Sequence, residues 1–390
     1  MSSEEITPFR VDIPQAEIDR LYTRLLTKDI RHPTTDVVPN TGDDYGLPTQ
    51  WAQDLTQYWL NDFSWTQAQE KLNQFPHFKT HIEGLDIHFI HQRSPNPNAI
   101  PILLLHGWPG SFHEFSEVIP PLCEGNNTDG PSFHCIVPSL PGFCFSSPPA
   151  RRGWTVKDTA RVFHTLMQRL GYSAYAVQAG DWGQFVAREL AANRAYACKV
   201  LHLNYCPGAL PEHLTDSDLT EREKGARAKG VDWRTNHVGY AVLMRTRPQT
   251  LGWMLQDNPI GLLAFVGEKY HEASNPAIHN SPKWKEHILT TVCLYYFTDC
   301  IASSGLIYYE NVPHHLFAQY ATEEANRIKC PFGYTSLWYD TAPNSRRAVE
   351  RTGKLVWYKE RDYAGHFACL EDPVGMVEDV KEVVGKHWEK

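Results

Sequence analysis

An aspartate flanked by small residues is the first feature of this sequence that suggests chemistry. Asp181 is the centre of residues 179–183, Ala-Gly-Asp-Trp-Gly, between an expected strand over 174–178 and a helix that begins near residue 184. Small neighbours around one reactive residue are typical of a nucleophile elbow, a strained strand-to-helix turn. Serine usually occupies that position, but the chain contains no Gly-x-Ser-x-Gly segment. Since Asp is also a preferred helix N-cap, Asp181 alone could equally be structural.

Two later residues complete a set that could work with Asp181. Asp340 directly follows an expected strand over 335–339, and His366 follows the next one, over 354–358. The order nucleophile, acid, histidine is that of the α/β-hydrolases. Ligands bind at the carboxyl ends of the strands of an open parallel sheet. The sequence therefore predicts that these three side chains meet at that edge.

A second turn with chemical potential spans residues 106–110, His-Gly-Trp-Pro-Gly, directly after a buried strand. Gly107 allows the backbone to approach a ligand closely. The bond between Trp108 and Pro109 is a candidate cis peptide, which would direct the Trp108 N–H into a pocket. The alternative is an ordinary Gly/Pro turn, which this segment alone does not exclude. We include His106, Gly107 and Pro109 in the candidate site as its motif.

Short apolar runs alternate with helical segments from residue 99 onward, and they must position these residues. Ile102–Leu105 is continuously apolar, as expected of a strand buried on both faces. Similar runs occur at 135–137, 174–177 and 200–203, and strands return at 335–339 and 354–358. Helical stretches over 157–170 and 184–192 separate them, and a closing helix spans 373–388. This alternation predicts an α/β fold with a mostly parallel central sheet.

The remaining segments divide the chain into four parts. Residues 1–95 combine two helical faces, at positions 18, 21, 25, 26 and at 51, 55, 58, 59, with a hairpin over 77–91 that turns at Glu83-Gly84. Residues 96–206 form the first part of the sheet. Strand signals then vanish, so 207–325 is predicted to be a helical insertion, a lid. Residues 326–390 complete the sheet.

Composition excludes several classes of protein. With 37 Lys and Arg against 45 Asp and Glu, the net charge of the 390 residues is −8, which disfavours nucleic-acid and anionic-membrane binders. The longest apolar run, residues 100–105, is too short to cross a membrane. The polar start of the chain shows no signal region, so we expect a mature chain that begins near residue 1 and a soluble, cytoplasmic protein. The nine cysteines form no Cys-x-x-Cys pair and are expected to be reduced thiols. The sequon at 126–128 is expected to lie in a surface loop.

Motifs for a metal or a cofactor are weak. His77 and His81 are four residues apart, but they lie in the expected hairpin and not on one helix face. Neither a His-Glu-x-x-His segment nor a glycine-rich phosphate loop occurs. We therefore predict no metal and no cofactor.

Taken together, these motifs resemble the epoxide hydrolases of the α/β-hydrolase superfamily. The resemblance is strongest to the microsomal-type group and its soluble fungal members, and it covers nearly the full chain. Its motifs are residues 75–90, 106–109, 139–146, 180–183 and 365–367. It implies a hydrolase core, a helical lid, an N-terminal meander that wraps the core, and a small-molecule epoxide substrate. The membrane-anchoring helix of the microsomal members is not found here, and a homodimer is compatible with the sequence.

The resemblance also implies roles for residues of the lid and the turns. Tyr240 and Tyr308 match the two tyrosines that donate hydrogen bonds to the ring oxygen, although the adjacent Tyr309 leaves the second assignment open by one residue. Both could instead simply pack. The backbone N–H groups of Trp108 and Trp182 would form the oxyanion hole.

The proposed chemistry explains why an aspartate replaces serine. Serine attack on an epoxide would give an ether, whereas Asp181 would give an ester. Water activated by His366, oriented by Asp340, can hydrolyse an ester, and the product would be a vicinal diol.

Three other functions fit the same constellation. A haloalkane dehalogenase also uses an Asp nucleophile, and Trp182 could hold the halide, but Trp108 leaves the second side-chain donor unfilled. An epoxide-opening cyclase of a biosynthetic pathway would use a nucleophile within the substrate. A ligand-binding protein without catalysis could share the fold. The sequence favours neither a role in detoxification nor a role in biosynthesis.

Overall fold

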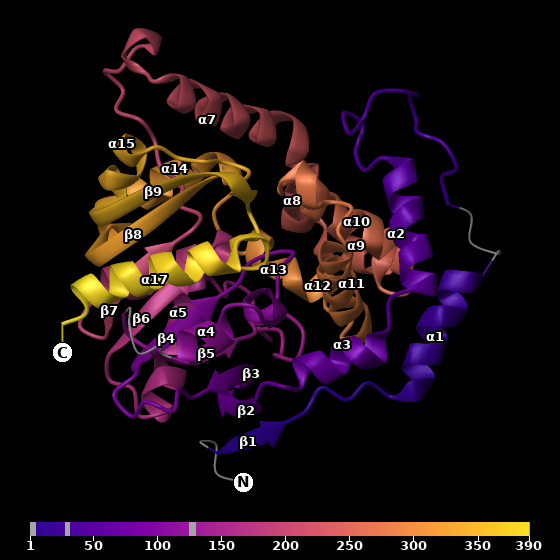
Figure 1. Ribbon diagram of the computed structural model, residues 1–390, viewed down its shortest axis with the longest axis horizontal. Coiled ribbons are helices and arrows are strands. Elements are labelled where there is room, and N and C mark those ends of the chain that lie inside the picture. The colour runs from indigo at the N-terminus through magenta and orange to yellow at the C-terminus, as the bar shows by residue number, and fades with distance from the viewer. Residues whose placement is uncertain (1–4, 28–31, 125–129, 390) are drawn as a thin grey trace.

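A nine-stranded sheet runs through the computed structural model (Figure 1), which describes residues 5–27, 32–124 and 130–389. The strand order is β1-β2-β3-β5-β4-β6-β7-β8-β9. The six neighbouring strands β5, β4, β6, β7, β8 and β9 are parallel to one another, whereas β1, β2 and β3 pair in an antiparallel manner. The mostly parallel sheet predicted from the sequence is thus confirmed. The strands are β1 (Ile6–Phe9), β2 (His77–Ile82), β3 (Leu85–Gln92), β4 (Ile100–Leu105), β5 (Phe133–Pro138), β6 (Tyr175–Ala179), β7 (Cys198–Leu203), β8 (Ile328–Tyr339) and β9 (Gly353–Gly365). The sequon at 126–128 lies outside the described residues.

The sheet is buried because its central strands are apolar on both sides. From Ile102 to Leu105 no residue of β4 is more than 1% exposed, as the continuous apolar run predicted. Helices α5 and α6 contact each other, α6 contacts β4, β6, β7 and β8, and α17 contacts β7 and β8. The helices of this part are α4 (Ile119–Cys123), α5 (Val156–Arg169), α6 (Asp181–Asn193), α15 (Arg346–Val349), α16 (Ala368–Glu371) and α17 (Pro373–His387).

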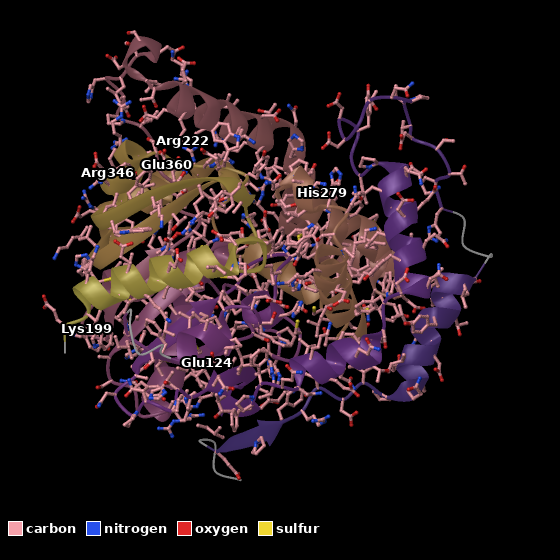
Figure 2. All side chains as sticks on the ribbon, in the orientation of Figure 1. Glu124, Lys199, Arg222, His279, Arg346 and Glu360 are labelled. Carbon is pink, nitrogen blue, oxygen red and sulfur yellow. The ribbon has the colours of Figure 1, made fainter. Side chains whose placement is uncertain are left out.

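Between β7 and β8 the described chain forms helices and no strand. Most of these helices gather beside the sheet, and α7 extends above β8 and β9 (Figure 1). An ion pair of 3.2 Å between Arg222 Nε on α7 and Glu360 Oε2 on β9 holds the two together; both residues are labelled in Figure 2. The helices are α7 (Glu221–Asp232), α8 (Gly239–Thr246), α9 (Pro248–Leu255), α10 (Pro259–Glu272), α11 (Pro282–Phe297), α12 (Ile301–Ser304), α13 (Leu306–Tyr309) and α14 (Phe317–Thr322). Among the described residues, no helix has the length and apolarity to span a membrane. We refer to α7–α14 and their connections as the lid.

The N-terminal part differs from expectation in two details. Strand β1 was not predicted; it is short, contains Pro8, and pairs only with β2, which fits the edge position where proline is tolerated. Leu26 was assigned to the buried helical face, but it is 65% exposed. It is the last residue of α1 (Gln15–Leu26), past the buried positions. The three N-terminal helices contact the lid. Helix α1 contacts α10, α2 (Thr49–Asn61) contacts α10 and α11, and α3 (Trp65–Leu72) contacts α11.

A close contact between α6 and β4 gives a stability prediction. A Cβ on Gly183 would overlap the carbonyl oxygen of Leu105. Gly183→Ala should therefore lower the free energy of unfolding by about 1–3 kcal/mol, the usual cost of overpacking. Gly239→Ala is the control, because a Cβ there meets nothing within 4 Å. Chemical denaturation compares the two; equal stabilities would contradict the proposed contact.

Candidate active site

Asp181 lies at a sharp turn between β6 and α6, as predicted for an elbow. Its φ angle is 40°, in the left-handed region that non-glycine residues rarely adopt. The small neighbours have steric reasons. A Cβ on Gly180 would lie 2.7 Å from Asn204 Nδ2, and one on Gly107 would overlap the Asp181 carboxylate itself. The backbone at residue 107 thus comes so close to Asp181 that only glycine fits.

The carboxylate of Asp181 is held by the backbone of the second turn. The Trp108 N–H donates a hydrogen bond of 2.7 Å to Oδ1, and the Trp182 N–H also stabilises the charged carboxylate. The bond between Trp108 and Pro109 is cis, as predicted. The Asp181 side chain keeps 20% of its surface exposed. Oδ1 is therefore held by the Trp108 backbone donor while the group remains open to a cavity.

His366 lies between the two aspartates. Its Nδ1 is 2.6 Å from Asp340 Oδ1, and its Nε2 is 3.7 Å from Asp181 Oδ2. The Asp340 side chain is fully buried, and its Oδ1 also accepts a hydrogen bond of 2.7 Å from the Thr341 N–H. The structure thus brings together the three residues that the chain order suggested, and it places His366 on the carboxylate oxygen that the backbone does not hold.

The loop that carries His366 is fixed on both sides. Glu371 on α16 accepts hydrogen bonds from the backbone N–H groups of Gly365 (2.9 Å) and Phe367 (3.1 Å), the two neighbours of His366. The same carboxylate accepts the Asn275 N–H of the lid at 3.2 Å. The His366 N–H itself donates to the Ala273 carbonyl at 2.8 Å. Sequence reasoning missed Glu371, for which no motif gives a signal.

The charges of the site shift its pKa values. Burial by itself lowers the pKa of His366, but the carboxylates of Asp340 and Asp181 outweigh it and raise this pKa to about 9. Burial raises the pKa of Asp181, while His366 and the two backbone N–H groups oppose that rise. Burial also raises the pKa of Glu114, a neighbour of both, to about 8. Near neutral pH, the site therefore favours a charged pair of Asp181 and His366.

The lid places two tyrosines near this pair. Tyr240 on α8 stacks on the Trp108 ring at 5.0 Å between centroids, and Tyr308 on α13 lies edge-on against Trp182, also at 5.0 Å. Burial raises the pKa of both tyrosines, so both stay protonated. Tyr308 is 2% exposed and Tyr309 is 49% exposed. Of the two adjacent tyrosines, Tyr308 is thus the one that faces the interior.

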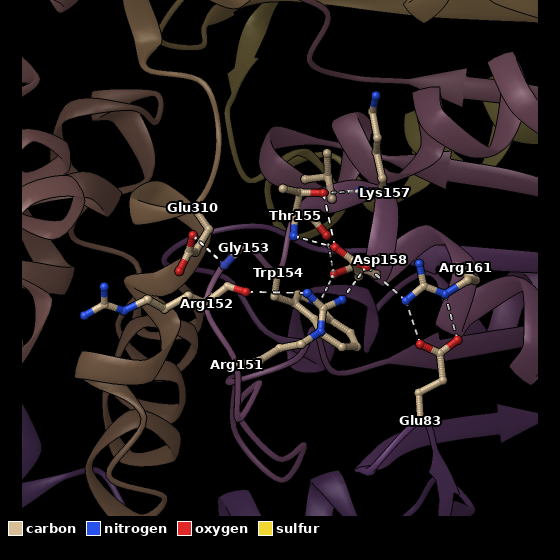
Figure 3. Close-up of polar contacts among 12 residues, drawn as sticks. Glu83, Arg151, Arg152, Gly153, Trp154, Thr155, Lys157, Asp158, Arg161 and Glu310 are labelled. Atoms are coloured by element: carbon tan, nitrogen blue, oxygen red, sulfur yellow. Dashed lines mark hydrogen bonds and ion pairs between the residues drawn. The ribbon is translucent and has the colours of Figure 1, made fainter.

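Contacts next to Tyr308 fix its helix to the core. The Gly153 N–H donates a hydrogen bond of 3.0 Å to Glu310 (Figure 3), and the Val156 N–H donates one of 3.0 Å to Asn311. In the same region Asp158 forms ion pairs with Arg151 and Arg161, and Arg161 reaches Glu83 in the β2–β3 turn. The lid is therefore joined to the core at Glu310 and Asn311, two and three residues after Tyr308, and the core is joined to the hairpin at Glu83.

One cavity opens onto Asp181, Tyr240 and His366, whereas Asp340 and Tyr308 lie behind its lining. Six residues that line this cavity were not predicted from the sequence, because they belong to no motif: Tyr205, Trp233, Lys269, Ala273, His314 and Thr341. Lys269 is 4% exposed, and its Nζ lies 4.6 Å from the centroid of the Tyr240 ring.

In the described parts of the chain, no group of three or more His, Cys, Asp or Glu could hold a metal ion. His106 is buried and accepts the Leu140 N–H at 3.1 Å, so it supports the turn from behind.

Comparison with known proteins gives matches along the whole chain. Residues 6–115 match the family model described as epoxide hydrolase N terminus, and residues 100–236 match the one described as alpha/beta hydrolase fold. Epoxide hydrolase 1 of Sus scrofa is 32% identical over 98% of this chain and 89% of its own.

Two solved structures are also similar. The epoxide hydrolase of Aspergillus niger has a TM-score of 0.88 at 36% identity and covers 98% of this chain and 97% of its own. The juvenile hormone epoxide hydrolase of Bombyx mori has a TM-score of 0.87 at 29% identity and covers 98% and 95%, respectively.

The charge balance of the site makes a prediction about titration. Asp340→Asn should lower the pKa of His366 from about 9, because it removes the Asp340 carboxylate, the charge that most strongly opposes the effect of burial. The pKa can be followed by NMR of the imidazole. Asp362→Asn is the control, since that side chain on β9 is 79% exposed. An unchanged His366 titration in Asp340→Asn would contradict the assigned cause.

Proposed function

Because the chain belongs to the epoxide hydrolase family and has the α/β-hydrolase fold, we propose that it converts an epoxide to a vicinal diol through a covalent ester on Asp181. One observation carries this proposal. The two oxygens of Asp181 have different partners: Oδ1 accepts the Trp108 N–H, and Oδ2 faces His366 Nε2 at 3.7 Å. A carboxylate held in this way can form an ester with one oxygen and keep the other in an oxyanion hole.

In the first step, the free oxygen Oδ2 attacks a ring carbon and the carbon–oxygen bond of the epoxide breaks. Oδ1, held by backbone N–H groups, becomes the carbonyl oxygen of the ester. The leaving alkoxide takes a proton from the tyrosine pair, Tyr240 and Tyr308, whose raised pKa values keep them protonated beforehand. Tyr240 lines the cavity directly and is the nearer donor in this proposal.

In the second step, His366 removes a proton from water, which attacks the ester carbon. The charge that develops on Oδ1 is stabilised by the N–H groups of Trp108 and Trp182. Collapse breaks the bond to Oδ2, so this oxygen leaves in the diol and the water oxygen stays on Asp181. The proton of the new carboxyl group passes to the departing oxygen of the diol, so Asp181 is again a carboxylate and His366 is again protonated, which completes the cycle.

Ester formation itself prepares His366 for this role. The free carboxylate of Asp181 is one of the charges that raise the pKa of His366 to about 9. The ester is neutral and removes that charge, so the pKa of His366 falls. His366, which is protonated in the resting enzyme, then passes its proton to the tyrosine that lost one in ring opening, and it becomes a competent base for water.

Two substitutions at the site should separate the steps. His366→Gln should allow ring opening and block hydrolysis, so intact-protein mass spectrometry should show one epoxide added at Asp181. Asp181→Asn should form no such adduct, because an amide is a poor nucleophile. In a single wild-type turnover in H₂¹⁸O, the label should enter Asp181 and not the diol. Label in the diol, or no adduct in His366→Gln, would argue for direct attack of water on the epoxide.

The lid tyrosines should share the stabilisation of the alkoxide. Tyr240→Phe and Tyr308→Phe should each slow ring opening by less than about 10²–10³-fold, the loss seen for an important oxyanion donor, because the other hydroxyl remains. The double variant should lose more than the product of the two. Pre-steady-state alkylation rates measure this effect.

Tyr309→Phe provides the matched control, because its side chain is 49% exposed beside Tyr308. It should react like the wild type. If both Tyr240→Phe and Tyr308→Phe open the ring at the wild-type rate, the tyrosines do not act on the leaving oxygen. Halide release from haloalkanes would then test the dehalogenase alternative.

A further inference from the structure

A second cavity adjoins the one that contains Asp181. The two share four lining residues, Tyr205, Trp233, His314 and Thr341. The inner cavity is small, with a volume of about 20 Å³, and the outer one has a volume of about 320 Å³. An epoxide at Asp181 therefore leaves the rest of a longer substrate in the outer cavity, and the chemistry of that cavity can select it.

The charged side chains of the outer cavity are mostly neutralised. Glu223 pairs with Arg347, whose Nε lies at 2.8 Å, and Arg227 pairs with Asp216 at 2.7 Å. Arg234 also lines this cavity. It has no ion pair or hydrogen bond with any residue in the described part of the chain. The exposed rim of the outer cavity thus carries one uncompensated positive charge, that of Arg234, although the whole chain carries a net charge of −8.

The histidine that separates the cavities does not add to this charge. Burial, together with the positive charge of Arg245, lowers the pKa of His314 to about 4, so it is neutral near pH 7. Its ring stacks on Tyr308 at 5.6 Å. The boundary is therefore aromatic and uncharged, and positive charge is concentrated further out, at Arg234.

Arg234 is positioned by an irregular helical segment. Residues Trp233–His237 form a π-helical turn between α7 and α8, and such turns occur frequently at functional sites. Trp233 lines both cavities, while its neighbour Arg234 lines only the outer one. A Cβ on Gly230 would lie 3.3 Å from Arg234 Nη1, so this glycine leaves room for the guanidinium.

We propose that the enzyme acts on epoxides with an apolar body and a carboxylate remote from the ring, and that Arg234 binds this carboxylate. The inference rests on the proposed function, because it places the ring at Asp181. The planar guanidinium fork of arginine matches a carboxylate in a bidentate manner. Apolar lining residues of the outer cavity, such as Phe317 and Pro207, suit the body between the two groups.

The test compares a long-chain epoxide that ends in a carboxylate with its methyl ester. Wild-type enzyme should favour the acid in kcat/KM, mainly through a lower KM. Arg234→Gln should reduce the ratio of acid to ester by about 10-fold, the value of one charge-assisted hydrogen bond. Added salt should weaken the preference of the wild type. Arg234→Lys keeps the charge and should keep part of the preference.

Arg227→Gln is the matched control, because Arg227 lines the same cavity but is already paired with Asp216. It should retain the acid preference. Thermal unfolding of each variant shows whether the fold is intact. Equal ratios in the wild type and in Arg234→Gln would overturn the assignment of Arg234, while diol formation from the methyl ester would still support the proposed function. If neither compound gives a diol, the proposed function fails with it.

Discussion

A carboxylate that must remain charged inside the protein is the constraint on which this structure depends. Burial raises the pKa of Asp181, and an unpaired buried charge is costly. The compensation comes from three directions: backbone N–H groups of residues 108 and 182, and the imidazole of His366. Each requires a separate segment of chain at close range. This explains the glycine at 107, where a Cβ would overlap the carboxylate itself.

The parallel sheet brings these segments together. The turn at Trp108, the elbow at Asp181, and the loops of Asp340 and His366 each follow a strand, namely β4, β6, β8 and β9. Their side chains meet because the strands point the same way. The lid then closes the site with aromatic rings on α8 and α13. The result is an enclosed site in which charge interactions are strong, since little water screens them.

How far the sequence predicts this arrangement depends on the kind of element. Loops after buried strands could be predicted, because apolar runs locate the strands and their ends share an edge. The core strands and the positions of Asp181, Asp340 and His366 therefore follow from the sequence. Strand β1 could not be predicted, because a short edge strand with a proline has no periodic pattern. The division of the chain into four parts stays a prediction.

In the lid, prediction was limited by packing. Tyr308 and Tyr309 are adjacent and chemically equal, and only the orientation of α13 buries one and exposes the other. Glu371, Lys269 and Arg234 were missed for the same reason: their surroundings come from distant segments.

The hydrogen bond from the His366 N–H to the Ala273 carbonyl has a further consequence. If the lid swung away as a rigid body, it would pull on the backbone of His366, the proposed general base. The position of the lid and the position of His366 are thus mechanically coupled. Small molecules that pass through an opening in a closed lid would disturb His366 less than a hinge motion of the lid would.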